Sequence, residues 1–294
     1  MNQFKTAALL GLLSGILVTI GYLITGNSTG ALLGLGLAAV TNFGSWFYSD
    51  KIALSAYKAQ PVTQAQAPQL YATVERLARK ADIPIPAVYV IPTQAANAFA
   101  TGRDPEHAAV AVTQGIMQTL SAEELEGVLA HELSHIINRD TLTQAVAATV
   151  AGAIAFMAQM LQYSLWFGGP GRDDDNGPNP LALILTIFLA PAAATIVQLA
   201  ISRTREFSAD AGAAKLTGNP RALASALERL EATARQLPMQ ANPAFEPLLI
   251  VNALPKQMFK SLFSTHPSTE ERIERLLTLE QEMGSSSGRV SFGL

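Results

Sequence analysis

Long apolar runs without charged residues dominate the N-terminal part of the chain. No charged side chain occurs between Lys5 and Asp50, and a polar, turn-forming stretch at 25–29 divides this run into two halves. Each half is long enough to cross the roughly 30 Å hydrocarbon core of a bilayer as a helix. The pattern predicts an N-terminal transmembrane hairpin over residues 1–49. The predicted spans cover about 7–24 and 30–48. Because the first run exceeds the usual core of a signal peptide and a second run follows at once, we interpret it as a retained anchor rather than a cleaved signal.

A second pair of apolar segments lies in the middle of the chain. Charge-free stretches run from Asp140 to Arg172 and from Asp175 to Arg203. Each contains a segment of about 20 predominantly apolar residues, so we expect a second transmembrane hairpin over 141–202. Its two segments cover about 145–167 and 181–201. They also carry glutamines and a proline, and alanine-rich helices buried in a soluble core would show a similar pattern.

The remainder of the chain is more polar and is expected to fold as one soluble domain. Residues 50–140 and 203–283 together are long enough for a modest core. Three short apolar stretches, separated by prolines and glycines, predict a small β-sheet. They cover residues 87–91, 96–100 and 108–112. The predicted fold class is a mainly α membrane protein with four apolar, transmembrane helices and an α+β domain that contains this small sheet. Residues 284–294 begin with Gly-Ser-Ser-Ser-Gly and are expected to form a flexible tail.

The distribution of charge predicts how the protein lies in the membrane. The loop at 168–180, between the third and fourth apolar segments, carries Arg172 against three aspartates, whereas basic residues gather on the opposite side. These are Lys5, Lys51, Lys58, Arg139, Arg203 and Arg205. The positive-inside rule then places both termini and the polar domain in the cytoplasm.

Composition also excludes some classes of function. The formal net charge is −3 at pH 7, with 20 Lys+Arg against 23 Asp+Glu, so no basic surface is predicted and we expect no nucleic-acid partner. The chain has no cysteine, which rules out disulfides and thiolate metal ligands. A metal site would have to use histidine and carboxylate side chains.

The sequence His131-Glu132-Leu133-Ser134-His135 is the clearest candidate for chemistry. Ser121 and Glu124 form a capping box ahead of residues that are apolar at helical spacing, which predicts a helix through this segment. On a helix the two histidines point the same way, and Glu132 lies beside them, where it can act on a water held by the metal. The alternative is a pair of histidines that make ordinary hydrogen bonds on a half-buried helix.

The chain also offers a third metal ligand, which a catalytic zinc usually requires. Glu206 and Asp210 follow the fourth apolar segment. On a helix they share a face, so one can bind the metal while the other receives the N–H of a ligand histidine. Two membrane crossings between His135 and Glu206 would return the chain to the same side and permit one site near the lipid surface. As an ordinary helix start, the same acids would simply be solvated.

These segments together resemble the HtpX family of integral-membrane zinc endopeptidases, relatives of the CAAX prenyl proteases. The resemblance rests, in order, on the paired N-terminal spans, residues 97–102, the H-E-x-x-H helix, two more apolar segments, residues 202–210 and residues 265–268. It implies a gluzincin-type catalytic domain at the cytoplasmic face of the cell inner membrane. The implied site holds one Zn2+ per chain on His131, His135 and Glu206, with Glu132 as catalytic base and Asp210 behind the ligands.

The resemblance also implies how substrate binds. Asn97, Ala98, Phe99 and Ala100 match an edge strand to which an extended polypeptide adds through main-chain hydrogen bonds, which tolerate many sequences. Alternatively, Asn97 is a turn residue that opens a strand. His266 would lie near the metal, where it stabilises the oxyanion or fills the open coordination position. The alternative for His266 is a surface histidine ahead of a capped helix.

The sequence therefore predicts a multi-pass membrane zinc metalloendopeptidase. The resemblance implies that its substrates are misfolded or damaged membrane and cytoplasmic proteins, in quality control under stress. Two other functions stay open: a prenyl-peptide protease of the CAAX type, whose known members have more spans, and a non-catalytic membrane scaffold stabilised by metal. Glu132 argues against the scaffold, because a structural metal site needs no general base. Self-cleavage and homo-oligomerisation are left open by the sequence.

Overall fold

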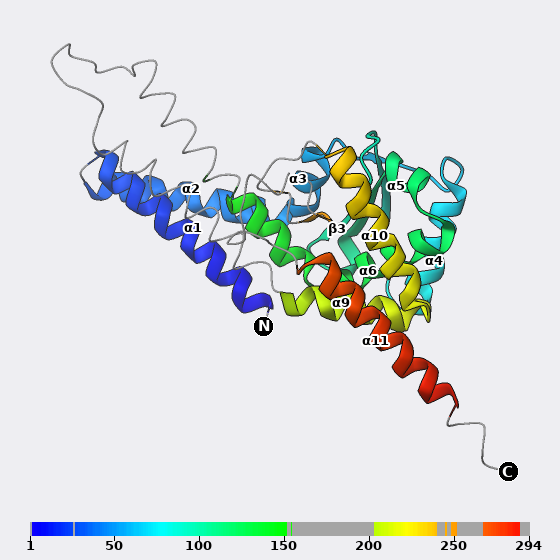
Figure 1. Ribbon diagram of the computed structural model, residues 1–294. Helices are drawn as coiled ribbons and strands as arrows, with labels where there is room; N and C mark the ends of the chain where they lie inside the picture. Colours follow the sequence, from blue (N-terminus) through cyan, green and yellow to red (C-terminus); the bar gives the residue numbers. More distant parts are fainter. Residues whose placement is uncertain are drawn as a thin grey trace.

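The N-terminal region is a helical hairpin that projects away from the rest of the protein (Figure 1). The computed structural model describes residues 2–25, 27–151, 154, 203–239, 245, 248–251 and 267–288. Helix α1 (Asn2–Thr25) and helix α2 (Ser28–Phe47) lie side by side. Asn27 starts α2, because its side chain accepts hydrogen bonds from the backbone N–H groups of Thr29 and Gly30. The two helices lie where the first two spans are predicted.

Small residues allow α1 and α2 to pack closely. Gly30, Gly34 and Ala38 are buried one turn apart on α2. A Cβ atom at Gly34 would overlap the carbonyl oxygen of Leu17, and one at Gly21 would overlap the carbonyl oxygen of Gly30. Such close backbone contact through small residues is typical of helices that associate within a membrane.

The outward face of α2 is apolar and exposed, as expected for a surface that meets lipid. Its large exposed side chains are Leu32, Leu33, Leu35, Leu37, Val40, Phe43, Trp46 and Phe47. By length and composition, α2 is the one helix among the described residues that is sufficiently long and apolar to cross a membrane. The prediction of four spans is therefore not confirmed. The second predicted hairpin lies largely outside the described residues, which retain a short apolar helix, Thr141–Ala151, at its start.

The polar domain contains a four-stranded mixed sheet, with strand order β1-β2-β4-β3. Its strands are β1 (Gln60–Pro61), β2 (Ala87–Ile91), β3 (Ala98–Gly102) and β4 (Ala108–Thr113). Strand β2 runs parallel to β4, and β3 pairs with β4 in the antiparallel direction, so that Phe99 lies opposite Ala111. The three predicted strands are all present. Among the described residues no strand pairs with the outer side of β3, so β3 forms the edge of the sheet that the structure describes.

Helices cover both faces of the sheet. Helix α3 (Ser49–Ala56) packs on the face that carries Phe99 and Ala111, and helix α6 (Ala122–Ile137) packs on the face that carries Ala98 and Val110. The other helices of the domain are α4 (Pro68–Lys80), α5 (Gln114–Thr119), α9 (Arg203–Thr217), α10 (Pro220–Gln236) and α11 (Thr269–Gly288). A single turn, η1 (Pro105–His107), joins β3 to β4. Helix α6 begins with the predicted capping box of Ser121 and Glu124. It packs against β3, α9 and α10 and so lies at the centre of the domain.

The buried apolar side chains form two clusters. The domain cluster fills the space between the sheet and helices α4, α6 and α10, and includes Leu77, Val110, Val128 and Leu129. The hairpin cluster joins the base of α1 to the domain and includes Leu13, Tyr57, Phe99, Val146 and Leu249. Neighbouring residues of β3 point to opposite clusters, because side chains alternate along a strand. The edge strand is therefore held from both sides.

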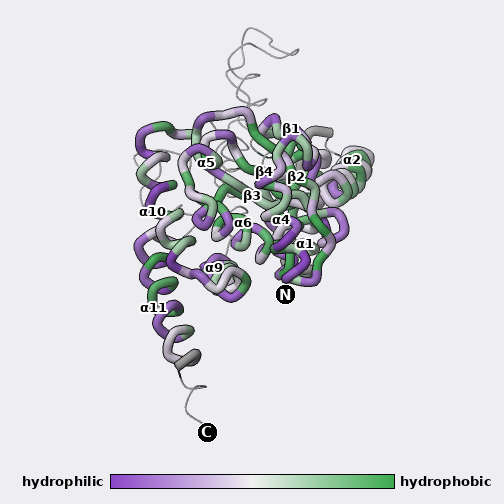
Figure 2. The backbone as a smooth tube through the Cα atoms, turned by 90° about the vertical axis from the view of Figure 1, so that its right-hand side faces the viewer, coloured by the Kyte–Doolittle hydropathy of each residue, from purple (hydrophilic) through white to green (hydrophobic). Residues whose placement is uncertain are grey.

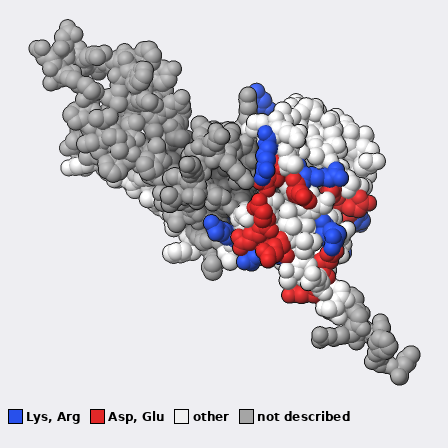
Figure 3. All heavy atoms as spheres, in the orientation of Figure 1, with Lys and Arg blue, Asp and Glu red and all other residues white. Residues whose placement is uncertain are grey.

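The outer helices are amphipathic and carry mixed charge. Along α11 hydrophilic and hydrophobic positions alternate in Figure 2, and acidic and basic side chains are interspersed on the face drawn in Figure 3. Arg221 on α10 pairs with Glu280 on α11 at 2.7 Å. Exposed pairs of this kind contribute little stability, so the apolar face of α11 does most to hold it in place.

Helix α11 extends further than predicted. It runs to Gly288 and so enters the segment 284–294, for which a flexible tail is predicted; the flexibility of that segment stays a prediction. Serine costs a helix about 0.5 kcal/mol and glycine about 1 kcal/mol relative to alanine, and the packing of the upstream part of α11 can offset a few such residues. Ser285 also donates a side-chain hydrogen bond to the carbonyl of Glu282 at 2.8 Å. The domain boundaries drawn from the sequence remain predictions.

Candidate metal centre

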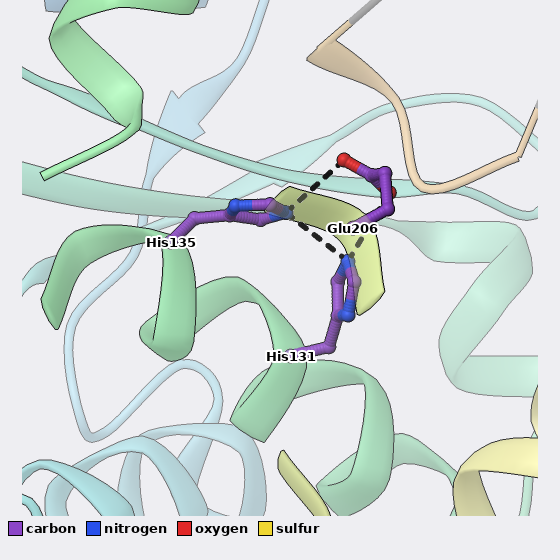
Figure 4. A group of neighbouring side chains, drawn as sticks. All are labelled: His131, His135 and Glu206. Atoms are coloured by element: carbon purple, nitrogen blue, oxygen red, sulfur yellow. Dashed lines mark hydrogen bonds and ion pairs between the residues drawn. The ribbon is translucent and has the colours of Figure 1, made fainter. Parts of the chain in front are cut away.

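Helix α6 and helix α9 bring three metal-binding side chains to one point. His131 and His135 project from the same face of α6, and Glu206 reaches them from α9 (Figure 4). The two Nε2 atoms lie 3.2 Å apart. Glu206 Oε1 lies 3.5 Å from His135 Nε2, and Glu206 Oε2 lies 3.8 Å from His131 Nε2. The three predicted ligands are thus neighbours, although 71 positions, 206 − 135, separate Glu206 from His135.

These separations fit a tetrahedral zinc site. With zinc bonds of about 2.0–2.2 Å to nitrogen and oxygen, tetrahedral geometry requires ligand atoms about 3.4 Å apart. The observed 3.2, 3.5 and 3.8 Å lie close to that value. All three side chains are buried. Two imidazoles and one carboxylate form a donor set that zinc accepts, so these residues could hold a metal ion.

Asp210 fixes the orientation of His131. Its Oδ1 atom lies 2.9 Å from His131 Nδ1, which leaves Nε2 directed at the metal position. Arg272 grips the same carboxylate with two hydrogen bonds, from Nε to Oδ2 at 2.9 Å and from Nη2 to Oδ1 at 2.7 Å. Burial alone would raise the pKa of Asp210, but the Arg272 charge and these hydrogen bonds hold it below its usual value. The carboxylate behind His131 therefore stays ionised.

Asp140 does the same for His135. The Oδ2 atom of Asp140 lies 3.2 Å from His135 Nδ1. A Schellman turn at the end of α6 makes this contact, with Arg139 in the left-handed region at φ 56. In that turn the N–H of Asp140 bonds the carbonyl of His135, and the N–H of Arg139 bonds the carbonyl of Ile136. Sequence reasoning missed Asp140, although a carboxylate directly after the H-E-x-x-H helix is a signal that it could have used.

The surroundings shift the pKa values of the two histidines in opposite directions. Burial lowers the pKa of His131 to about 4, so its ring is neutral at pH 7, as a metal ligand must be. Burial would also lower the pKa of His135, but the hydrogen bond to Asp140 and the charges of Glu206 and Glu132 raise it instead. A metal ion must therefore compete with a proton for His135.

Glu132 lies beside the ligands and is buried. Its burial raises the pKa to about 7, and the negative charge of Glu206 acts in the same direction. The backbone of Ala100, on the edge strand β3, makes a hydrogen bond to this carboxylate. A carboxyl group with a pKa near 7 can take up and release a proton at neutral pH, which is the property of a general base.

Arg272 is a further charged residue of the site that sequence reasoning missed. Its side chain is only 2% exposed, and besides Asp210 it approaches Glu206, with Nη1 3.8 Å from Oε2. A buried cation is tolerated only with such partners, so the acids of α9 determine where Arg272 lies. Nothing in its local sequence distinguishes it from Arg275, which is one turn later and 55% exposed. Only the fold brings it to the metal ligands.

The predicted substrate residues lie on the edge strand next to Glu132. Ala98, Phe99 and Ala100 belong to β3, and Asn97 precedes it. All four are buried. The Asn97 side chain accepts a hydrogen bond from the N–H of Ala98 and donates one to the carbonyl of Val251. The structure thus brings the predicted strand and the predicted base together, whereas His266 lies outside the described residues.

Comparisons with known proteins find similarity to one family of peptidases. Residues 64–280 match the family profile described as Peptidase family M48. A "Protease HtpX homolog" of Nostoc punctiforme is 67% identical over 282 residues, which cover 96% of this chain and 98% of that protein. Another, from Pyrococcus furiosus, is 52% identical over 281 residues, 95% of this chain and 96% of that protein.

The fold is similar to that of a solved structure. The crystal structure of S. mikatae Ste24p matches with a TM-score of 0.51 at 22% sequence identity. The match covers 93% of this chain but only 65% of the Ste24p chain. At this identity the likeness concerns the arrangement of helices and strands, and about a third of the Ste24p chain lies outside the match.

Proposed function

Because the chain belongs to peptidase family M48, and its close relatives are named as HtpX proteases, we propose that it is a membrane zinc endopeptidase. Its proposed substrates are misfolded or damaged membrane and cytoplasmic proteins. The observation that carries the proposal is the set of donor atoms on His131, His135 and Glu206, 3.2–3.8 Å apart, with Glu132 buried beside them. Histidines that only pack in a core do not require a carboxylate from another helix at the spacing of zinc ligands.

Each residue of the site would have a separate role in the hydrolysis of a peptide bond. His131 and His135, through Nε2, and Glu206 would hold one zinc ion, which supplies a Lewis acid for the carbonyl and makes water more acidic when bound. Glu132 removes a proton from the attacking water as its oxygen bonds to the carbonyl carbon. Glu132 then returns that proton to the amine nitrogen as the C–N bond breaks. Asp210 and Asp140 keep both imidazoles in the orientation that ligation requires.

We further propose that an extended polypeptide binds along β3. Asn97, Ala98, Phe99 and Ala100 would supply main-chain and amide contacts, and His266 remains proposed as an additional group near the metal. The hydrogen bond between Ala100 and Glu132 supports this placement, because it sets the proposed base directly against the strand. Recognition through the main chain suits substrates that are unfolded and differ in sequence.

The proposed location is the cell inner membrane, with several spans and with the catalytic domain and both termini in the cytoplasm. The apolar, exposed face of α2 and the membrane-type packing of α1 against α2 support an integral membrane protein. A second hairpin over 141–202 and the positive-inside distribution of Lys and Arg complete the proposed topology. Self-cleavage and homo-oligomers are further proposals that follow from the resemblance to proteases of this type.

Cleavage of casein by the purified protein in detergent tests this function. Wild type should cleave casein, a metal chelator should stop the cleavage, and added Zn2+ should restore it. Glu132→Gln should bind the same amount of zinc and cleave nothing. Mass spectrometry of the products then separates internal cleavage of unfolded chains from removal of a short prenylated C-terminal peptide. Full activity in Glu132→Gln would overturn the assignment.

A further inference from the structure

A short segment of this protein already occupies the outer side of the edge strand. The N–H of Ile250 donates to the carbonyl of Ala98 at 3.1 Å. The side-chain amide of Asn97 donates to the carbonyl of Val251 at 3.1 Å, and Arg272 Nη1 donates to the carbonyl of Ile250 at 3.2 Å. Three main-chain groups of Ile250 and Val251 are thus held beside β3, where a bound peptide would lie.

Together with the two apolar clusters, the segment leaves this part of the strand buried. Ala98 and Phe99 are 0% exposed, and Asn97 is 2% exposed. Pairing with an added strand requires main-chain groups that the new chain can reach. The carbonyl of Ala98 and the amide of Asn97 are already engaged, so an incoming peptide cannot use them while the 248–251 segment stays in place.

The side chains of the segment are uncharged, aliphatic and buried. Residues 248–251 read Leu-Leu-Ile-Val. Leu249 is buried in the hairpin cluster, and Ile250 and Val251 are buried in the domain cluster. The segment thus passes from one apolar cluster to the other directly beside β3. Space beside the strand that accepts these side chains would accept branched aliphatic side chains of another peptide in the same way.

We propose that residues 248–251 are an internal occupant of the peptide-binding edge, and that substrates are extended segments rich in Leu, Ile and Val which displace it. This inference rests on the proposed function. Asn97, Ala98 and Arg272 bind main-chain N–H and C=O groups of residues 250 and 251, and any extended peptide has the same groups. A folded protein hides its aliphatic segments, whereas a misfolded one exposes them. Competition with an internal segment therefore favours damaged proteins over folded ones.

A proline substitution tests the competition directly. Ile250→Pro removes the N–H that binds Ala98, whereas Ile250→Val keeps this N–H and the aliphatic character. Since one hydrogen bond is lost from the internal competitor, Ile250→Pro should lower the KM for casein about five-fold with little change in kcat. Ile250→Val should behave as wild type. Equal KM values in wild type and a folded Ile250→Pro protein would overturn the inference.

A peptide added in trans keeps the proposal testable if Ile250→Pro fails to fold. A capped peptide with the sequence of residues 245–252, Phe-Glu-Pro-Leu-Leu-Ile-Val-Asn, should inhibit casein cleavage by wild type competitively. The same peptide with proline in place of Ile250 should inhibit at least several-fold less. Equal inhibition by both peptides, or none by either, would count against the inference.

Hydrogen exchange gives a readout that does not depend on activity. In zinc-loaded Glu132→Gln protein, the amide of Ile250 should exchange slowly, and excess casein should accelerate its exchange. If wild type never cleaves casein, the proposed function fails, yet this exchange experiment still tests the occupant. A different outcome is zinc-dependent cleavage of casein in which Ile250→Pro leaves KM unchanged and casein leaves the exchange of the Ile250 amide unchanged. In that case the proposal that residues 248–251 occupy the peptide-binding edge is wrong, and the protease assignment stands.

Discussion

The carboxylate of Asp140 lies 3.2 Å from Nδ1 of His135, five positions earlier in the chain, and holds that ring from behind. A partner of this kind fixes the tautomer and the orientation of a ligand histidine. Since His131 has a matching partner in Asp210, both imidazoles are aligned before any metal arrives. The site is therefore prepared by carboxylates that do not themselves contact the metal position.

Asp140→Asn should weaken zinc binding about 10- to 100-fold, because an amide orients His135 less firmly and contributes no charge. Competition with a chromogenic chelator measures the affinity. Asp104→Asn is the matched control, since Asp104 forms a similar pair with His107, 2.6 Å apart, in an exposed turn. Unchanged zinc affinity in Asp140→Asn would mean that Asp140 has no part in holding His135.

Arg272→Met should destabilise the protein by about 3 kcal/mol, because removal of one partner leaves the buried carboxylate of Asp210 without its compensating charge. Chemical unfolding in detergent, followed by circular dichroism, measures the loss. Arg275→Met, on the exposed side of the same helix, should change stability by less than about 1 kcal/mol. The double variant Arg272→Met/Asp210→Asn should recover part of the stability. A loss in the double variant equal to the sum of the single losses would show that the two residues do not interact.

Gly34→Leu should disrupt the N-terminal hairpin, because a side chain at this position would collide with the backbone of Leu17. Overpacking of this kind costs about 1–3 kcal/mol. Gly36→Leu is the matched control on the same helix, because a Cβ at Gly36 would meet nothing within 4 Å. Limited proteolysis of the detergent-solubilised proteins should cut Gly34→Leu faster than wild type and Gly36→Leu at the wild-type rate. Equal rates for both variants would contradict the observed packing of α1 on α2.

Local patterns predict those parts of the fold and site that depend on neighbouring residues. The capping box of Ser121 and Glu124 predicts the start of α6, and helical periodicity predicts that His131 and His135 share a face. Short apolar stretches that are separated by prolines and glycines predict the three longer strands. Glu206 is predictable because Glu206 and Asp210 follow the H-E-x-x-H helix and the fourth apolar segment in an order that resembles a known family. Each of these signals is present in the sequence itself.

The groups that support the site depend instead on contacts between distant residues. Arg272 meets Asp210 across 62 positions, and no local pattern distinguishes it from an exposed arginine. The occupation of β3 by residues 248–251 joins segments 152 positions apart, 250 − 98, through a main-chain hydrogen bond. Such bonds involve no particular side chain, so the sequence offers no sign of them. The length of α11 has a related reason, because its packed part carries the helix into a serine run of weak propensity.

The raised pKa of Glu132 predicts how the stability of the metal-free protein depends on pH. Its folded pKa of about 7 exceeds the ordinary value of 4.5, so the folded state binds a proton that the unfolded state releases between these values. Stability should therefore fall as pH rises from about 4.5 to about 7, by about 3 kcal/mol from this one group. In Glu132→Gln, position 132 carries no ionisable group, so this pH-dependent loss of stability should be absent. At pH 8 the metal-free variant should therefore be more stable than metal-free wild type. Unfolding in denaturant at pH 5 and pH 8, with chelator present, gives the comparison. If the difference in stability between the two proteins is the same at both pH values, the carboxyl group is not held in the protonated form by its burial, and its suitability as a base near neutral pH needs another cause.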